Sequence, residues 1–304
     1  MQVYLPIAEM SVNALAIVGM GWVAGVLSGL FGVGGGFLLT PFLIFLGVPA
    51  AIAVGTQANQ LIGASVSGVL GHWRRGAVDV KMALVMLAGS AIGAALGVGI
   101  FGALQRLGQI DLVISLLYVV LLGFVGLSML AESIVALIRG HPAQLVKRSS
   151  RGWLQRLPFQ TRFPRSKLYV SSLLPLAIGV FGGVMVAVMG IGGGFLMVPA
   201  MIYILRMPAS LIAGTSLLQI IATTAAVTLL QASVNHTVDV LLAMLLLVGG
   251  VIGAQLGTRL AAHLHGETAR ALLALLMVTV ALGLAWHLIQ QPQEPYSLVT
   301  EAPR

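Results

Sequence analysis

The sequence predicts an all-α integral membrane protein made of two inverted-topology repeats. Its composition gives the first indication, because 59% of the 304 residues are hydrophobic and only 8% are charged. A typical soluble domain carries about 25% charged residues, since its surface faces water. The other two indications are apolar stretches long enough to cross a bilayer and a glycine motif that occurs once in each half.

The distribution of charge excludes several classes of function. The net charge is +8, and eight of the sixteen Lys and Arg residues lie in the segment 139–167, which has no Asp or Glu. Such clustering is typical of loops that stay on the cytoplasmic side of a membrane, so we expect no nucleic-acid partner. The chain has no cysteine and lacks paired carboxylates and HExxH or GxSxG motifs. We therefore expect no enzyme, no cofactor and no metal site.

The apolar stretches divide into long and short ones, since about 20 helical residues are needed to cross the hydrocarbon core. The long stretches are 12–31, 50–71, 79–104, 110–138, 168–189, 208–232, 238–262 and 268–289. Two shorter ones, 37–47 and 195–205, follow the glycine motifs, and eleven residues reach only about 17 Å as a helix. We expect each repeat to hold four long transmembrane helices and one short broken helix after a GxGGG turn.

The repeat itself is read from matching residues. The segment Gly32–Pro41, GVGGGFLLTP, recurs 158 positions later as Gly190–Pro199, GIGGGFLMVP. Later agreements include Gly55-Thr56 with Gly214-Thr215, Gln60 with Gln219, and Val78-Asp79-Val80 with Val238-Asp239-Val240. We predict a first membrane repeat at 1–138, a basic cytoplasmic linker at 139–167, a second membrane repeat at 168–290 and a tail at 291–304.

Loop charges predict that the two repeats are inverted. The loop 72–81 contains three Lys or Arg residues, whereas its counterpart 233–239 contains none. Cationic loops remain cytoplasmic, so these equivalent loops should face opposite sides, with both termini outside. The segment 139–167 also interleaves aromatic and basic residues, and an interfacial segment on anionic lipid is the alternative to a plain linker.

The two GxGGGF motifs predict broken helices that bind an anion. Consecutive glycines are unfavourable inside a helix, and free N–H groups at the start of the next helix attract anions. GxGxxG is not met, because Phe37 and Phe195 occupy its last position, and no P-loop Lys follows. The candidate solute-binding residues here are Gly34, Gly35, Gly36, Phe37, Gly192, Gly193, Gly194 and Phe195. Close helix packing is the alternative, and we prefer it for the glycines at 21, 25, 29, 93, 97, 253 and 257.

A second set of candidates opens the helix after each short piece. Uncharged donors suit an oxyanion that must be bound without tight ion pairing, and several of these residues share a helical face. The set comprises Thr56, Gln57, Asn59, Gln60, Thr215, Ser216 and Gln219. Hydrogen bonding between helices is the alternative. We prefer it for Ser65, Ser67, Thr223, Thr224 and Thr228.

The paired segments GVLSGLFGVGGGFLLTP and GVMVAVMGIGGGFLMVP, each followed by a GT helix start, resemble the TauE/SafE family of sulfite exporters, also called TSUP permeases. The resemblance covers about residues 12–289. It implies transport of sulfur-containing oxyanions or organosulfur acids, such as sulfite, sulfoacetate or thiosulfate, across a bacterial cytoplasmic membrane.

We therefore expect a multi-pass secondary transporter in contact with the lipid bilayer. It would bind a small anionic substrate near the midplane and export it by alternating access. Import of a similar anion, transport of an unrelated small solute, and a non-transporting scaffold remain as alternatives, and a homo-oligomer is left open. If the solute is an anion, the membrane potential alone provides about 2.3 kcal/mol per charge at 100 mV.

Overall fold

The computed structural model describes residues 2–31, 36–74, 76–139, 158–192, 194–261 and 266–290. The first half contains β1 (Gln2–Leu5), β2 (Met10–Asn13), α1 (Ala14–Phe31), α2 (Gly36–Phe45), α3 (Ala50–Arg74), α4 (Val80–Arg106) and α5 (Ile110–Arg139). The second half contains β3 (Gln160–Phe163), β4 (Leu168–Ser171), α6 (Leu173–Met189), α7 (Gly194–Pro199), α8 (Ala209–Leu230), α9 (Val240–Ala261) and α10 (Gly266–Ile289). Two π-helical segments, η2 (Ala200–Ile204) and η3 (Gln231–Asn235), continue α7 and α8.

The predicted all-α membrane class is confirmed. Five helices in the described part of the chain are long and apolar enough to cross a membrane. Helices α1 and α6 are shorter, at 18 and 17 residues. The short pieces predicted at 37–47 and 195–205 correspond to α2 and to α7 with η2. The predicted span 168–189 was wrong at its start, because residues 168–171 form a strand and the helix begins only at Leu173.

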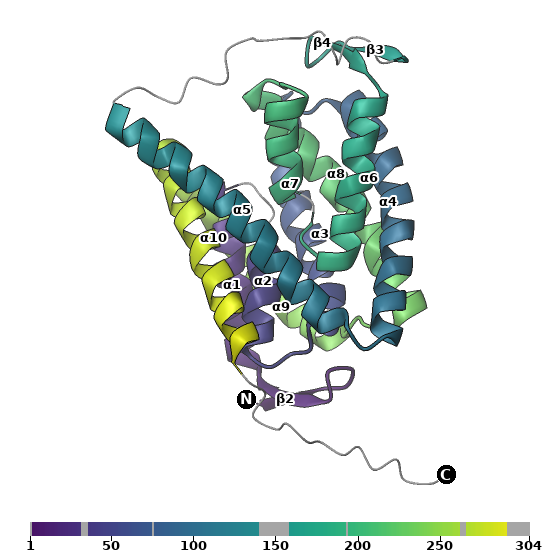
Figure 1. Cartoon of the computed structure of the whole chain (residues 1–304), viewed down its shortest axis with the longest axis vertical. Helices are drawn as coiled ribbons and strands as arrows, with labels where there is room; N and C mark the ends of the chain where they lie inside the picture. The colour runs from purple at the N-terminus through teal and green to yellow at the C-terminus, as the bar shows by residue number, and fades with distance from the viewer. Residues whose placement is uncertain are drawn as a thin grey trace.

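Two β-hairpins precede α1 and α6, and the sequence analysis did not predict them. Gln2 pairs with Asn13 in the first hairpin, and Gln160 pairs with Ser171 in the second. The two registers differ by 158 positions at every paired residue, which is the offset of the glycine motifs. Strand β3 therefore lies within the segment interpreted as a linker. The hairpins sit at opposite ends of the molecule (Figure 1).

The helices of the two halves pack against each other rather than within each half. Helix α1 packs along α9 and α4 along α6, while α3 packs on α8 and α5 on α10. If each helix is replaced by its counterpart in the other half, the α1–α9 pair becomes the α6–α4 pair. The α3–α8 and α5–α10 pairs stay the same. Figure 1 shows α5 and α10 as a crossing pair at one side of the bundle.

Glycines form the closest of these helix contacts. A side chain at Gly93 would meet the backbone of Val180 in α6, and one at Gly253 would meet the backbone of Trp22 in α1. The same holds at Gly25, which lies against Gly250. The packing role predicted for these glycines is confirmed, because a small residue lets two backbones approach closely in a membrane.

Each hairpin is held to the opposite half by one buried aspartate. Asp79 accepts hydrogen bonds from the amide of Met82, at 3.1 Å, and from the amide of Ser166 in the β3–β4 turn, at 3.1 Å. Asp239 accepts from amides in the first turn of α9 and from the amide of Ile7 in the β1–β2 turn, each at 3.1 Å. Each carboxylate thus satisfies orphan helix N–H groups and holds the turn of the other repeat.

Cationic side chains gather at the end that holds the β3–β4 hairpin. Lys81 donates to the carbonyl oxygen of Arg162 at 2.9 Å, and Arg165 lies beside Gly76. The start of α8 reaches the same end, where Thr215 bonds the amide of Asp79. The exposed cations Arg74, Arg162, Arg165, Lys167 and Arg206 lie on the segments that meet here. This distribution agrees with the charge bias on which the predicted orientation rests.

Candidate functional site

The second glycine motif breaks the chain between α6 and α7. Gly190 ends α6 with φ of 69° and donates its amide to the carbonyl of Val186 at 2.8 Å. Gly192 also has a positive φ, of 59°. Both conformations favour glycine, because a Cβ is strained in the left-handed region. In the first motif, Gly36 begins α2. The candidates Gly34, Gly35 and Gly193 lie outside the described residues.

The two breaks meet at the middle of α3. A Cβ placed on Gly36 would lie 2.8 Å from Leu61 Cδ1 and 3.3 Å from the carbonyl oxygen of Gly190. One placed on Gly192 would lie 2.7 Å from the same Leu61 atom. Leu61 is 1% exposed, so its side chain fills the space between the two breaks. Nothing in the sequence singled out this leucine.

Gln57 and Tyr118 bind the last carbonyl groups of α6. The Gln57 side-chain Nε2 donates to the carbonyl of Gly190 at 2.6 Å and approaches that of Met189 at 3.5 Å. The Tyr118 hydroxyl donates to the carbonyl of Met189 at 2.8 Å, and it also lies close to the Thr40 side chain. These contacts satisfy orphan carbonyls at a helix end in the interior of the protein. Tyr118 was missed, because it is a lone tyrosine in an apolar run.

The side-chain Nε2 of Gln57 donates to the end of α6, so Gln57 does not have the role that was predicted for it. Its Oε1 is buried and has no hydrogen-bond partner among the described residues, and the same is true of Thr40 Oγ1. Gln57 was predicted to donate to an anion. In this arrangement it orients the second break, and its free atom is an acceptor.

Thr56 and Thr215 are not brought together. The amide of Asp239 donates to Thr56 Oγ1 at 3.0 Å, and the amide of Asp79 donates to Thr215 Oγ1 at 3.0 Å. Each threonine therefore lies beside the aspartate of the opposite half, and these aspartates hold hairpins at opposite ends of the molecule (Figure 1). Since both hydroxyls are occupied there, neither faces the two breaks.

The remaining polar candidates lie along α3 and α8. Gln60 reaches toward the carbonyl of Gly21 at 3.5 Å, within the α1–α9 contact, and Asn59 bonds its own helix at Thr56. Ser216 and Gln219 are buried in α8. Thr223, interpreted as a packing residue, does hydrogen-bond across to Ser90 of α4 at 2.8 Å.

The aromatic and glycine candidates differ in their surroundings. Phe37 is buried in the same apolar cluster as Tyr118 and Met189. Gly194 begins α7, and the side chain of Phe195 lies outside the described part. No group of three or more His, Asp or Glu side chains that could hold a metal occurs among the described residues. In the described part of the chain, the breaks are thus surrounded by backbone groups and neutral side chains, Leu61 among them.

Comparison with known proteins places this fold in a family. Residues 17–284 match the family described as sulfite exporter TauE/SafE. The chain belongs to the TauE/SafE family. It is 32% identical over 273 residues to a probable membrane transporter protein, YjnA, of Bacillus subtilis (strain 168), covering 89% of this chain and 99% of that one. It is 31% identical over 287 residues to a probable membrane transporter protein of Xylella fastidiosa (strain 9a5c), covering 91% and 97%. No solved structure matches the chain significantly.

The TauE/SafE match confirms the resemblance seen in the paired glycine motifs. The matched range begins within α1 and ends within α10, so it includes both breaks and all the candidate residues. This TauE/SafE protein is a multi-pass membrane transporter, whose substrate and direction follow only as proposals.

Proposed function

We propose that this TauE/SafE transporter exports a small sulfur-containing oxyanion or organosulfur acid, of the sulfite, sulfoacetate or thiosulfate class, across a bacterial cytoplasmic membrane. The observation that carries the proposal is the meeting of the two glycine breaks. Gly36 and Gly192 both contact Leu61, and Gly36 lies beside the Gly190 carbonyl. The family membership supports the substrate class.

The chemistry of the breaks suits weak binding of an anion. Helix α2 has ten residues and starts at Gly36, so the N–H groups of its first turn and the positive end of its dipole lie at the meeting point. Glycine lets a solute approach the backbone closely, as at other helix N-termini that bind anions. Among the residues that the structure describes, none of the buried polar or charged side chains is a Lys or Arg, and such neutral contacts allow the solute to be released.

We also propose that the two repeats, 1–138 and 168–290, are inverted and exchange conformations during transport. The hairpins at opposite ends and the exchanged Asp79 and Asp239 contacts support inversion. The short helices differ: α2 is one continuous α-helix, whereas α7 has six residues and continues as the π-helix η2. Two different conformations of one repeated element are what alternating access requires. In this arrangement Leu61 must move for the solute to pass.

The membrane potential is sufficient to drive export of an anion. A potential of 100 mV contributes about 2.3 kcal/mol per charge, and about 1.4 kcal/mol corresponds to a factor of ten. A monovalent anion would then be expelled against a gradient of roughly fiftyfold. The proposal therefore needs no coupling ion.

Flux in proteoliposomes tests this function. Purified protein should transport at least one of sulfite, thiosulfate and sulfoacetate, with a rate that follows an imposed potential, and Gly36→Val should abolish that flux. Gly99→Ala is the matched control, because nothing lies within 4 Å of a Cβ at Gly99. Flux that ignores the potential and follows a pH gradient would contradict potential-driven export. Folded protein that transports none of these anions would favour a scaffold or an unrelated solute.

A further inference from the structure

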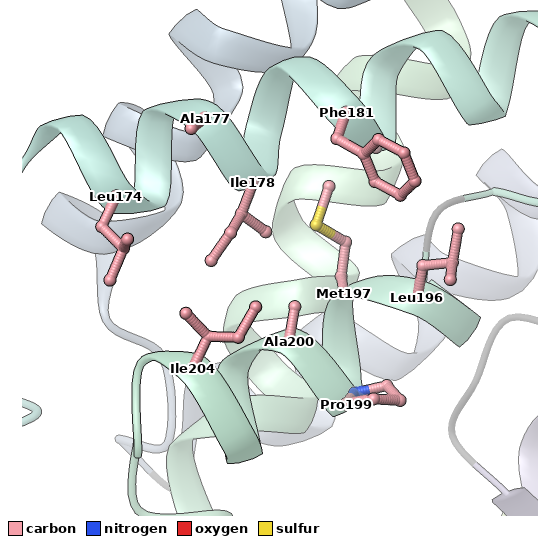
Figure 2. Close-up of a pocket in the computed structure, with 10 residues that line it drawn as sticks. Leu174, Ala177, Ile178, Phe181, Leu196, Met197, Pro199, Ala200 and Ile204 are labelled. Atoms are coloured by element: carbon pink, nitrogen blue, oxygen red, sulfur yellow. The ribbon is translucent and has the colours of Figure 1, made fainter. Parts of the chain in front are cut away.

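An apolar groove of about 520 Å³ runs between α6 and the α7–η2 segment. Figure 2 shows its lining side chains facing one another across the two helices. The residues that line the groove include Leu174, Phe181, Leu196, Ala200 and Ile204. Phe181 is 55% exposed and Ile204 is 45% exposed, so the groove opens sideways, toward lipid in a membrane-spanning protein.

The equivalent place in the first half carries different residues and a different neighbour. By the 158-residue offset, Ala200 corresponds to the larger Phe42, and Leu196 corresponds to Leu38, which is 0% exposed. Helix α10 also packs on α2 there, with the ring of His287 set edge-on against Phe45 at 6.2 Å between centroids. The two halves therefore differ in the residues at this place, most clearly at Ala200 and Phe42.

The groove ends at the cationic side of the molecule. Leu174 and Ile204 lie at the same end of the groove (Figure 2), and Leu174 is in the first turn of α6, just after β4. Leu168 of β4 packs in the same apolar cluster as Leu174, and the exposed Lys167 immediately precedes it. Arg206, also exposed, lies two residues beyond Ile204. Cations at this level of a membrane protein interact with anionic lipid headgroups.

We propose that the groove binds one acyl chain of an anionic phospholipid, whose headgroup lies against Lys167 and Arg206. The lining side chains offer the chain no hydrogen-bonding group, which suits a hydrocarbon, and every buried methylene favours binding. The two cations select a negative headgroup. The acyl chain lies over Ala200, where the first half has the bulkier Phe42, and it supports the π-helical η2 against α6.

The test is lipid binding to the purified full chain, measured by native mass spectrometry and by thermal shift. Phosphatidylglycerol and phosphatidylcholine with identical acyl chains are compared. Phosphatidylglycerol should bind more tightly, and Arg206→Gln or Lys167→Gln should each weaken it about fivefold, with little effect on phosphatidylcholine. Ala200→Phe, which installs the first-half residue, should weaken both lipids about tenfold, the equivalent of about two buried methylene groups.

The control is Ala95→Phe on the exposed face of α4, which should leave binding unchanged. Equal loss in both phenylalanine variants, or equal binding of the two lipids, would overturn the proposal. A stable dimer that Ala200→Phe dissociates would also overturn it, since a second copy would then cover the groove. If Ala200→Phe fails to fold, the cysteine-free chain allows a spin label at Ile204→Cys. That label should be broadened by spin-labelled phosphatidylglycerol more than by spin-labelled phosphatidylcholine, and no difference would refute the assignment.

Discussion

Replacing Asp239 by Asn should release the β1–β2 hairpin and leave the rest of the fold in place. Asp239 is 0% exposed, and its Oδ1 accepts from the amides of Leu241 and Leu242 while its Oδ2 accepts from Ile7. Asparagine still caps a helix through its remaining oxygen. Its NH₂ group, however, would face the Ile7 amide, donor against donor. A hydrogen bond to a charged group contributes about 1.5–3 kcal/mol, and this one is only partly buried, so its loss should cost an amount toward the lower end of that range.

Amide hydrogen exchange in detergent or nanodiscs measures the effect locally. Asp239→Asn should speed exchange in residues 2–13, and Asp239→Ala should do so with an additional loss of about 1 kcal/mol from the missing cap. The matched control is Asp79→Asn, which should speed exchange in the β3–β4 hairpin, because Asp79 binds Ser166 there. Faster exchange in both hairpins for either variant would refute the idea that each aspartate holds one turn of the opposite half.

Three further predictions follow from the helix contacts and the breaks. Gly93→Ala should lower the free energy of unfolding by about 1–3 kcal/mol, because its Cβ would meet the Val180 backbone. Gly99→Ala in the same helix should not lower it. Thermal unfolding compares the two variants, and equal melting temperatures would contradict the packing role. Gln57→Leu and Tyr118→Phe should be non-additive in a double-mutant cycle, since both side chains reach the Met189 carbonyl; simple additivity would argue against a shared acceptor. Leu61→Ala should lower stability by about 2–5 kcal/mol and raise the passive anion leak of proteoliposomes, and an unchanged leak would argue that Leu61 does not close the path.

Much of the membrane fold was predictable, because its signals are local. Long apolar runs indicate helices, and the offset of 158 between glycine motifs identifies the repeat. The hairpins were missed, although the same offset already aligns Leu5-Pro6 with Phe163-Pro164. A four-residue strand is too short to show a clear alternation, and only the repeat would have drawn attention to it.

The candidate site was less predictable, since its geometry depends on how distant helices cross. The convergence of the breaks on Leu61 requires the position of α3 between them, and a leucine in an apolar helix carries no signal of that place. Thr56 and Thr215 looked like a pair because both follow a glycine in equivalent positions. Equivalence under an inversion places two residues at one point only when they lie near its axis. Under the proposed inversion these two lie away from its axis, since each bonds the amide of the other half's aspartate.

The same reasoning explains why Gly36 and Gly190 do meet. Under the proposed inversion, residues near its axis stay close to each other, as these two do. The positive end of α2 at Gly36 and the carbonyl end of α6 at Gly190 are therefore adjacent. When no solute is present, the polar groups of both helix ends still need hydrogen-bond partners from the protein. Gln57 and Tyr118 do so for the carbonyls. A solute that binds at the start of α2 thus enters beside a helix end already neutralised by the protein, which favours an anion held by backbone N–H groups over one held by a buried cation.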